Sequence, residues 1–185
     1  MSTVAGRQAA LLRGVNVGTA KRVAMADLRA LVEGLGYTDV RTLLNSGNVV
    51  YTAPGVTPGA AAARIEGALA VRLGVPAMVV ALAAEELAVA VADNPLARVA
   101  DNPSRLLVAV PADPQASTRL EPLVEQDWSP EALALGARVA YLWCPAGVIA
   151  SRVSAAVGRA LGDEVTSRNW ATMTKLQALA ADRSG

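Results

Sequence analysis

Histidine is absent from this 185-residue sequence, and Cys144 is its only cysteine. Without an imidazole the chain has no Ser-His-Asp or Cys-His nucleophile pair and no imidazole general base at neutral pH. A single cysteine excludes an intrachain disulfide, and with no histidine it leaves too few ligands for zinc. We therefore expect no metal and no cofactor. We interpret Cys144 as a packing residue because it has no basic or resolving partner.

Aromatic residues make up only 3% of the sequence, which contains no phenylalanine, although 53% of its residues are hydrophobic. Valine, leucine and alanine must therefore fill the interior, and they can pack at high density. The opening MSTVAGRQAALLRG has neither the long apolar segment nor the cleavage site of a secretory signal. The longest apolar runs fall short of the roughly 20 residues that span a membrane. We expect a cytoplasmic protein with no membrane partner.

The formal net charge is only +1, but the charges are unevenly distributed along the chain. Residues 1–26 contain four basic side chains and no acidic one, residues 27–150 contain eight basic and thirteen acidic, and residues 151–185 contain five basic and three acidic. Both ends are therefore positive and the middle is negative. This asymmetry is much smaller than that of a typical nucleic-acid-binding domain.

The first half of the sequence alternates between strand-like and helix-like patterns. Apolar runs and turn residues predict strands at 8–12, 40–44, 49–52 and 76–82. Helical spacing of apolar residues, with Gly36 and Gly74 as C-terminal stops, predicts helices at 25–35 and 58–73. This order is β-α-β-β-α-β, the split βαβ arrangement of ferredoxin-like folds. The stretch AAEELAVAVADN adds one more helix.

The second half repeats this order beyond a segment in which Asp-Asn-Pro occurs twice. Proline ends helices and interrupts the pairing of β-strands. We therefore expect residues 94–103 to form a linker between an N-terminal half, residues 1–93, and a C-terminal half, residues 104–185. Strands are predicted at 105–110, 131–135, 138–144 and 164–167, and helices at 114–124, 148–161 and 170–181. The predicted fold class is α+β, with two ferredoxin-like (β-α-β-β-α-β) halves packed together and an extra helix after each. One continuous α+β sandwich is the alternative.

Three stretches give the sequence a family resemblance. The stretch LLRGVNVGTAKRVAMADLRALVEGLGYTDVRTLLNSGNVVY is similar to the leading pattern of the bacterial family called domain of unknown function 1697. Two later stretches, YLWCPAGVIASRVS and VTSRNWATMTKL, resemble further segments of that family. The resemblance implies a two-part ferredoxin-like α+β protein, usually cytoplasmic, with no established activity. At residues 18–22 this chain reads GTAKR, where relatives more often have a second glycine and a lysine-rich tail.

The loop RGVNVGTAKR is the first candidate site. Gly14 and Gly18 permit backbone amides to converge ahead of the helix that begins near residue 25. Charge for a phosphate or carboxylate would come from three side chains, Arg13, Lys21 and Arg22. The loop is neither a P-loop nor a dinucleotide-binding glycine motif. In the alternative interpretation it is a structural connection, in which the Asn16 side chain satisfies buried backbone groups and the cations are solvated.

Two further motifs add candidate residues. Ser46 and Asn48 of the hairpin NSGNV could bind a ligand, but a tight turn requires these residue types for its own geometry. Arg168 and Asn169 stand where a strand meets a helix, with Asn169 as a plausible N-cap. In the alternative interpretation, Trp170 packs in the core and Asn169 only caps the helix that follows. In the functional interpretation this corner approaches the N-terminal loop, with Arg13, Lys21 and Arg168 around one anion, but the sequence leaves open whether the two segments meet.

The leading functional hypothesis is therefore a protein that binds a small anionic, phosphorylated ligand. The second hypothesis is nucleic-acid binding through the sheet face, where Tyr51, Tyr141, Trp128 and Trp143 would stack on bases. The third is an enzyme that uses Lys21 or Asp27 as its acid-base group on a phosphorylated substrate. The sequence leaves the oligomeric state and the identity of the ligand open.

Overall fold

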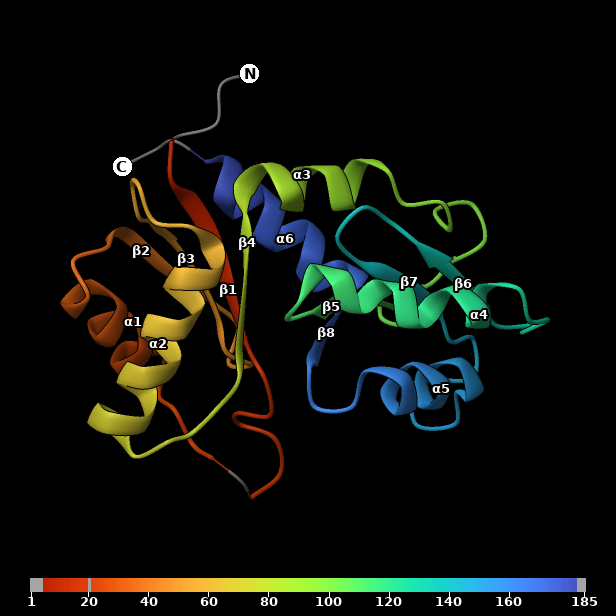
Figure 1. Cartoon of the computed structure of the whole chain (residues 1–185), viewed down its shortest axis with the longest axis horizontal. Coiled ribbons are helices and arrows are strands. Elements are labelled where there is room, and N and C mark those ends of the chain that lie inside the picture. Colours follow the sequence, from red (N-terminus) through yellow and green to blue (C-terminus); the bar gives the residue numbers. More distant parts are fainter. Residues whose placement is uncertain (1–4, 20, 183–185) are drawn as a thin grey trace. The chain divides into compact units, whose positions relative to one another are not determined.

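The computed structural model describes residues 5–19 and 21–182 of the chain. These residues form two compact units. The first unit contains the residues up to Leu87 and those from Leu176 on, whereas Ala88–Lys175 form the second. The second unit is thus inserted into the first. Two helices, α3 (Ala84–Ala92) and α6 (Trp170–Ala181), each begin in one unit and end in the other (Figure 1).

The first unit is built on a four-stranded antiparallel sheet with strand order β2-β3-β1-β4. Its elements before α3 are β1 (Arg7–Leu12), α1 (Met25–Gly34), β2 (Thr38–Leu43), β3 (Asn48–Thr52), α2 (Pro58–Leu73) and β4 (Val79–Ala83). The predicted order β-α-β-β-α-β is confirmed. Gly36 and Gly74 follow α1 and α2 in the left-handed region, with φ of 86° and 64°, as helix C-terminal glycines do.

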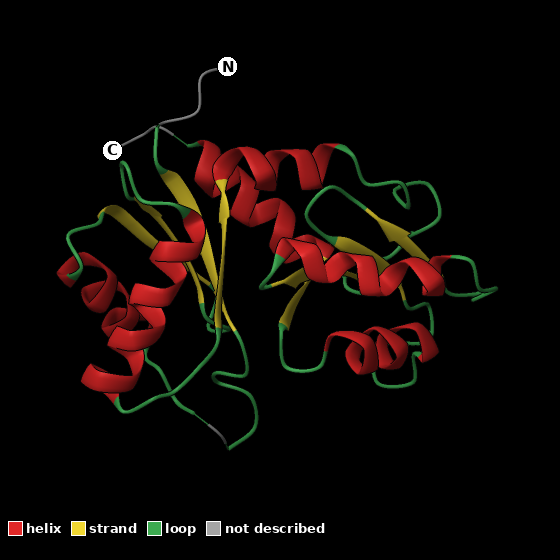
Figure 2. Cartoon of the chain, in the orientation of Figure 1, coloured by secondary structure: helices red, strands yellow, loops and turns green. Residues whose placement is uncertain are grey.

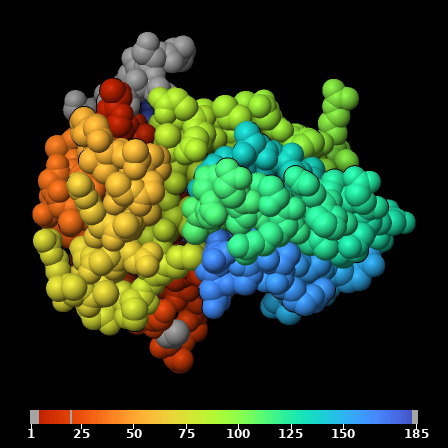
Figure 3. Space-filling model, viewed as in Figure 1, coloured from red at the N-terminus to blue at the C-terminus, as the bar shows by residue number. Residues whose placement is uncertain are grey.

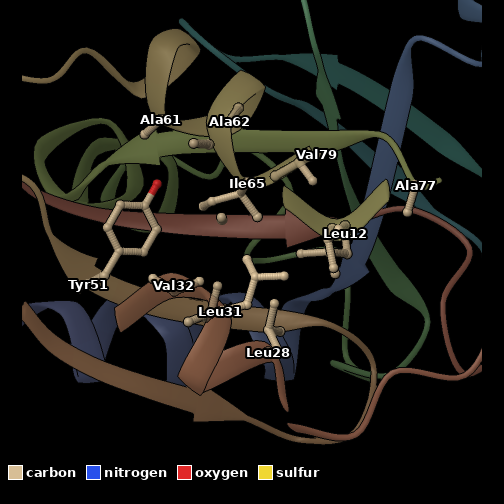
Figure 4. Close-up of a cluster of buried hydrophobic side chains, with 14 of the residues drawn as sticks. Leu12, Leu28, Leu31, Val32, Tyr51, Ala61, Ala62, Ile65, Ala77 and Val79 are labelled. Atoms are coloured by element: carbon tan, nitrogen blue, oxygen red, sulfur yellow. The ribbon is translucent and has the colours of Figure 1, made fainter. Parts of the chain in front are cut away.

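Helices α1 and α2 cover one face of this sheet and bury its core (Figure 4). Leu28 and Leu31 of α1 are at most 4% exposed, and Ile65 of α2 is fully buried. Small residues at Ala61 and Ala62 bring α2 close to the strands, and its other side faces solvent (yellow in Figure 3). A core without phenylalanine is therefore closed by short aliphatic side chains, as the composition predicts.

The end of α6 is attached to the first unit by two arginines. The buried Arg7 of β1 donates from Nη1 to the Asp39 carbonyl oxygen at 2.8 Å and from Nη2 to the Leu179 carbonyl oxygen at 3.5 Å. Arg41 of β2 forms an ion pair of 2.8 Å with Asp182. Burial lowers the pKa of Arg7, yet a guanidinium stays charged at neutral pH.

The second unit holds another four-stranded antiparallel sheet, of strand order β6-β7-β5-β8, again with helices packed against it (Figure 2). Its elements after α3 are β5 (Leu106–Pro111), the 3₁₀ helix η1 (Pro114–Leu120), α4 (Glu121–Val124), β6 (Ala132–Leu135), β7 (Ala140–Trp143), α5 (Arg152–Leu161) and β8 (Val165–Asn169), followed by α6. Val153 and Val157 of α5 pack with Leu120 and Leu142 in its core.

Several predicted elements differ in extent from the observed ones, and three of these differences are large. The helix predicted from 148 begins at Arg152, because Ser151 caps it and accepts from the Ser154 N–H at 3.0 Å. The strand predicted from 76 begins at Val79. The helix predicted at 114–124 is divided, because Pro122 lacks the N–H that would continue η1 into α4. The segment 94–103, predicted as a linker, lies within the second unit.

Candidate functional site

The loop after β1 is organised by the side chain of Asn16, a residue whose backbone has a left-handed φ of 56°. Its Nδ2 donates to the Val23 carbonyl oxygen at 2.8 Å, and its Oδ1 accepts from the Val23 N–H at 2.9 Å. Its backbone N–H donates to the Lys21 carbonyl oxygen at 2.9 Å. Asn16 therefore joins the start of the loop to its end. The interpretation that its side chain satisfies backbone groups is confirmed.

The same loop lies against the turn between β2 and β3. Asn16 Nδ2 also donates to the Asn45 carbonyl oxygen at 2.8 Å, and the Leu12 N–H donates to the Gly47 carbonyl oxygen at 2.9 Å. Gly47 has φ of 80°, and a Cβ there would approach Val15 Cγ2 to 2.6 Å. The contact follows from the sheet order, because β1 pairs directly with β3 and Leu11 stands opposite Asn48. Two motifs interpreted separately in the sequence thus form one surface.

Positive charge gathers on this surface ahead of α1. Lys21 and Arg22 are exposed, and Arg13 is partly buried. The N-cap of α1 is Ala24, whose side chain cannot accept from the first-turn amides, whereas Thr57 caps α2 through its hydroxyl. The nearest acidic side chain in sequence is Asp27 in the first turn of α1, and it is exposed. The Arg22 guanidinium donates to the Gly18 carbonyl oxygen, and Lys21 and Arg22 both directly precede the positive end of α1 in the chain.

Ser46 lies in the turn beside this loop and Asn48 begins β3, and the two differ in exposure. Ser46 is exposed, whereas Asn48 is fully buried. Asn48 Nδ2 donates to the Leu43 carbonyl oxygen at 3.0 Å and to Ser46 Oγ at 2.9 Å. These bonds hold the hairpin turn together, which is the structural role weighed for the NSGN motif.

Arg168 and Asn169 belong to the second unit. The Asn169 Oδ1 accepts from the Thr172 N–H at 2.9 Å, so Asn169 caps α6 as predicted. Arg168 Nη1 donates to Thr166 Oγ1 and to the Ser167 carbonyl oxygen, both at 2.9 Å. Burial lowers the pKa of Arg168 to about 10, which leaves it charged at neutral pH. Its convergence with the N-terminal loop stays a prediction, since the two segments belong to different units.

The remaining aromatic and thiol candidates are packing residues. Tyr51 and Tyr141 are fully buried, and Trp143 is only 6% exposed, so they do not form an open stacking face. The Tyr141 hydroxyl donates to the Ala90 carbonyl oxygen at 2.6 Å. Cys144 is fully buried, and burial raises the pKa of its thiol, although a hydrogen bond with Ser151 opposes the shift. Tyr51, Tyr141 and Cys144 therefore stabilise the units as packing residues.

Sequence reasoning missed a buried carboxylate at the start of α5. Glu131 accepts from the Ser151 hydroxyl at 2.5 Å and from the backbone N–H groups of Arg152 and Val153, each at 3.1 Å. The guanidinium of Arg152 also lies 5.9 Å from the ring centre of Trp128. No local pattern reveals this contact, because Glu131 lies 20 positions before Ser151. The positive end of α5 is therefore occupied by the protein's own carboxylate.

The described residues contain neither a group of metal-binding side chains nor a helix that could span a membrane. Within residues 5–19 and 21–182, no three His, Cys, Asp or Glu side chains gather closely enough to hold a metal ion. Across the same residues, no helix has both the length and the apolar character needed to cross a bilayer.

Comparisons with known proteins give a family and a fold but no activity. The family model described as "Protein of unknown function (DUF1697)" matches residues 6–141. The conserved bacterial protein SP0830 from Streptococcus pneumoniae has a similar structure, with a TM-score of 0.71 and 22% sequence identity over 94% of this chain and 98% of that one. None of the curated proteins matches the sequence. At this identity the structural likeness concerns the fold alone.

Proposed function

Because this chain belongs to the DUF1697 family of proteins of unknown function, we propose its role from its own residues: it binds a small anionic, phosphorylated ligand at the loop of residues 13–22. The observation that carries the proposal is the pairing of exposed Lys21 and Arg22 with the start of α1, whose N-cap Ala24 has no polar side chain. Backbone amides at a helix start and nearby cations are the usual partners of phosphate groups.

The conformation of the loop supports this proposal. Gly14 and Gly18 have φ of 67° and 58°, and Lys21 has φ of 30°. Non-glycine residues in the left-handed region are uncommon and cluster at ligand-binding sites, where surrounding contacts hold them. Asn16 supplies those contacts through its bonds to Val23 and Asn45. These bonds hold Asn16 and Val23 in place before an anion binds, and this reduces the entropic cost of binding.

The proposal extends to the architecture of each half. We assign both sheets to the ferredoxin-like fold, because the orders β2-β3-β1-β4 and β6-β7-β5-β8 each set the first and third strands of a half side by side in the centre. In this arrangement the loop after the first strand and the turn before the third strand meet at one end of the sheet. The proposed site in the first unit lies at that end.

A thermal-shift titration at low salt tests the binding proposal. The probes are inorganic phosphate, pyrophosphate, ribose 5-phosphate and AMP. A probe present at 100 times its Kd adds about 2.7 kcal/mol to the free energy of unfolding. We expect stabilisation by at least one probe, its loss in Lys21→Met and Arg22→Met, and its retention in Lys175→Met, which removes an exposed lysine of α6. Stabilisation by none of the four, or equal stabilisation of all variants, contradicts the proposal.

A further inference from the structure

A separate hollow lies in the second unit, at the end of the sheet where β5 begins and β7 ends. It has a volume of about 560 Å³ and is open to solvent. Its two walls are the segments 101–105 and 143–145. The lining residues are Asp101, Asn102, Pro103, Arg105, Trp143 and Pro145. Sites for small molecules usually have volumes of roughly 300–1,000 Å³ and combine an apolar surface with a few polar groups. This hollow has that size, and its lining is more polar than apolar.

The walls of the hollow are fixed by hydrogen bonds within the second unit. Asn102 Oδ1 accepts from the N–H and the hydroxyl of Ser104, at 3.0 and 2.6 Å, and the Arg105 N–H donates to the Asn102 carbonyl oxygen at 3.0 Å. The Cys144 N–H donates to the Arg105 carbonyl oxygen at 3.0 Å, which extends the ladder between β5 and β7. The side chain of Arg105 reaches across and donates to the Pro145 carbonyl oxygen. The two walls are thus joined before any ligand arrives.

Two opposite charges line this hollow without pairing. The bond to Pro145 is the one side-chain hydrogen bond that Arg105 makes with the described residues, which leaves most of its N–H groups available. Asp101 has neither a hydrogen bond nor an ion pair with that part of the chain, and it forms none with Arg105. Both side chains are exposed. A ligand that carries one charge of each sign would satisfy both.

The apolar part of the hollow comes from a tryptophan and two prolines. Trp143 lies on β7 between Leu106 and Ala132, and its ring is almost entirely packed within the second unit. Its indole N–H makes no hydrogen bond to the residues that the structure describes, whereas the Trp128 indole N–H donates to the Leu123 carbonyl oxygen at 2.7 Å. Buried tryptophans usually satisfy this donor. Trp143 therefore offers a ligand both an apolar edge and an unused donor.

We propose that this hollow binds a small zwitterion with an apolar part, of the class of α-amino acids with apolar side chains. The ligand carboxylate is held by the guanidinium of Arg105, and its ammonium group by the carboxylate of Asp101. Its side chain packs against Trp143, Pro103 and Pro145. Charge-assisted hydrogen bonds at both ends give selectivity for the zwitterion over molecules that carry only one of the charges. This site is distinct from the loop of residues 13–22 and does not depend on it.

Nuclear magnetic resonance of the ¹⁵N-labelled full chain tests the site with three probes: L-phenylalanine, N-acetyl-L-phenylalanine and L-phenylalaninamide. We expect L-phenylalanine to shift the indole N–H signal of Trp143, while that of Trp128 stays in place because it is already bonded. Signals are assigned with Trp143→Phe and Trp128→Phe. The two blocked probes, each of which lacks one charge, bind about tenfold more weakly or worse.

Variants identify which charge each residue recognises. Arg105→Gln and Asp101→Asn each weaken L-phenylalanine binding about tenfold. Arg105→Gln leaves the affinity for the amide unchanged, and Asp101→Asn leaves that for the N-acetyl form unchanged, because those probes lack the matching group. Arg98→Gln and Glu125→Gln, which alter exposed charges elsewhere in the second unit, bind L-phenylalanine as the parent chain does. Failure of L-phenylalanine to bind, equal binding of all three probes, or unchanged binding in both hollow variants overturns the proposal.

Discussion

Oε2 of Glu131 lies 2.5 Å from Oγ of Ser151, 20 positions further along the chain. The Ser151 hydroxyl donates to the carboxylate and at the same time accepts from the Ser154 N–H at the first turn of α5. The carboxylate itself accepts from the N–H groups of Arg152 and Val153. A negative side chain that is only 10% exposed is thus placed at the positive end of a helix. This contact fixes the strand β6 to the helix α5.

We expect Glu131→Gln to lower the free energy of unfolding by about 1–2 kcal/mol, because it replaces charged acceptors at a helix start by a neutral amide. Urea unfolding at neutral pH measures the change. The matched control is Glu164→Gln. Glu164 pairs with Arg119 on the surface, both side chains are about half exposed, and the loss should stay below about 0.5 kcal/mol. Equal losses of unfolding free energy in the two variants would show that the Glu131 contacts stabilise the protein no more than an ordinary surface ion pair does.

The stabilisation by Glu131 should depend on pH. Burial by itself would raise the pKa of this carboxyl, but hydrogen bonds from Ser151, Val153 and Arg152 outweigh burial and lower it below the ordinary value of 4.5. A lowered folded-state pKa means that the contribution is present above the unfolded-state pKa and is lost as the pH falls through the folded-state value. The difference in unfolding free energy between parent and Glu131→Gln should therefore shrink between neutral pH and pH values below 4.5. A constant difference over that range would contradict the assignment.

Gly47→Ala should destabilise the first unit by about 3 kcal/mol, because it combines a left-handed backbone with a steric clash. The new Cβ would lie 2.6 Å from Val15 Cγ2 and 2.9 Å from Leu12 Cβ. Gly55→Ala is the control, since Gly55 has a similar φ of 73° with no atom within 4 Å of the added Cβ. Thermal unfolding separates the two, and the loss for Gly55→Ala should be about 1–2 kcal/mol.

Asn16→Ala should cost about 2 kcal/mol, because it removes the acceptor of the Val23 N–H and places an alanine in a left-handed conformation. Amide hydrogen exchange should show the Val23 N–H losing its protection first. Asn45→Ala removes a neighbouring asparagine side chain but leaves the backbone oxygen that accepts from Asn16, so its stability should change little. Unchanged exchange at Val23 in Asn16→Ala would refute the role of this side chain in closing the loop.

Cys144 should resist thiol reagents in the folded protein. Its thiol is fully buried, and burial raises its pKa, so little thiolate forms at neutral pH. Because it is the only cysteine, one colorimetric thiol assay reports on it alone. We expect complete reaction within the dead time in denaturant and reaction limited by unfolding in buffer. Fast reaction in buffer would mean that β7 and α5 open locally around the thiol.

Local signals predicted most of the elements correctly. The helix Pro58–Leu73 has a capping threonine, a first-turn proline and a closing glycine, and its observed ends match the prediction. The helix Trp170–Ala181 follows Asn169, whose capping bond was also predicted. Errors in the predicted ends of elements arose where the sequence had no clear start or stop residue. Val148 and Ile149 continue an apolar pattern towards α5, yet they are exposed and precede the cap at Ser151.

The two proposed binding surfaces were predicted less completely, because they depend on contacts between distant segments. The glycines and cations of the loop at 13–22 were recognisable, but its contact with the turn at Asn45 depends on the pairing of β1 with β3. The hollow beside Arg105 depends on the junction of two turns about 40 residues apart, of which neither has a sequence signature. The division into units was also hidden, because the apolar pattern of α6 does not reveal which of its residues pack with which sheet.

The insertion of one unit into the other makes the two units unequal in what each needs to fold. Ala88–Lys175 is contiguous, so the second unit forms from one uninterrupted stretch of chain. The first unit needs segments from both sides of that stretch, because Arg7 bonds to the Leu179 carbonyl oxygen, 172 positions away. Chains truncated before Leu176 should therefore keep every residue of the second unit and lack the segment that completes the first.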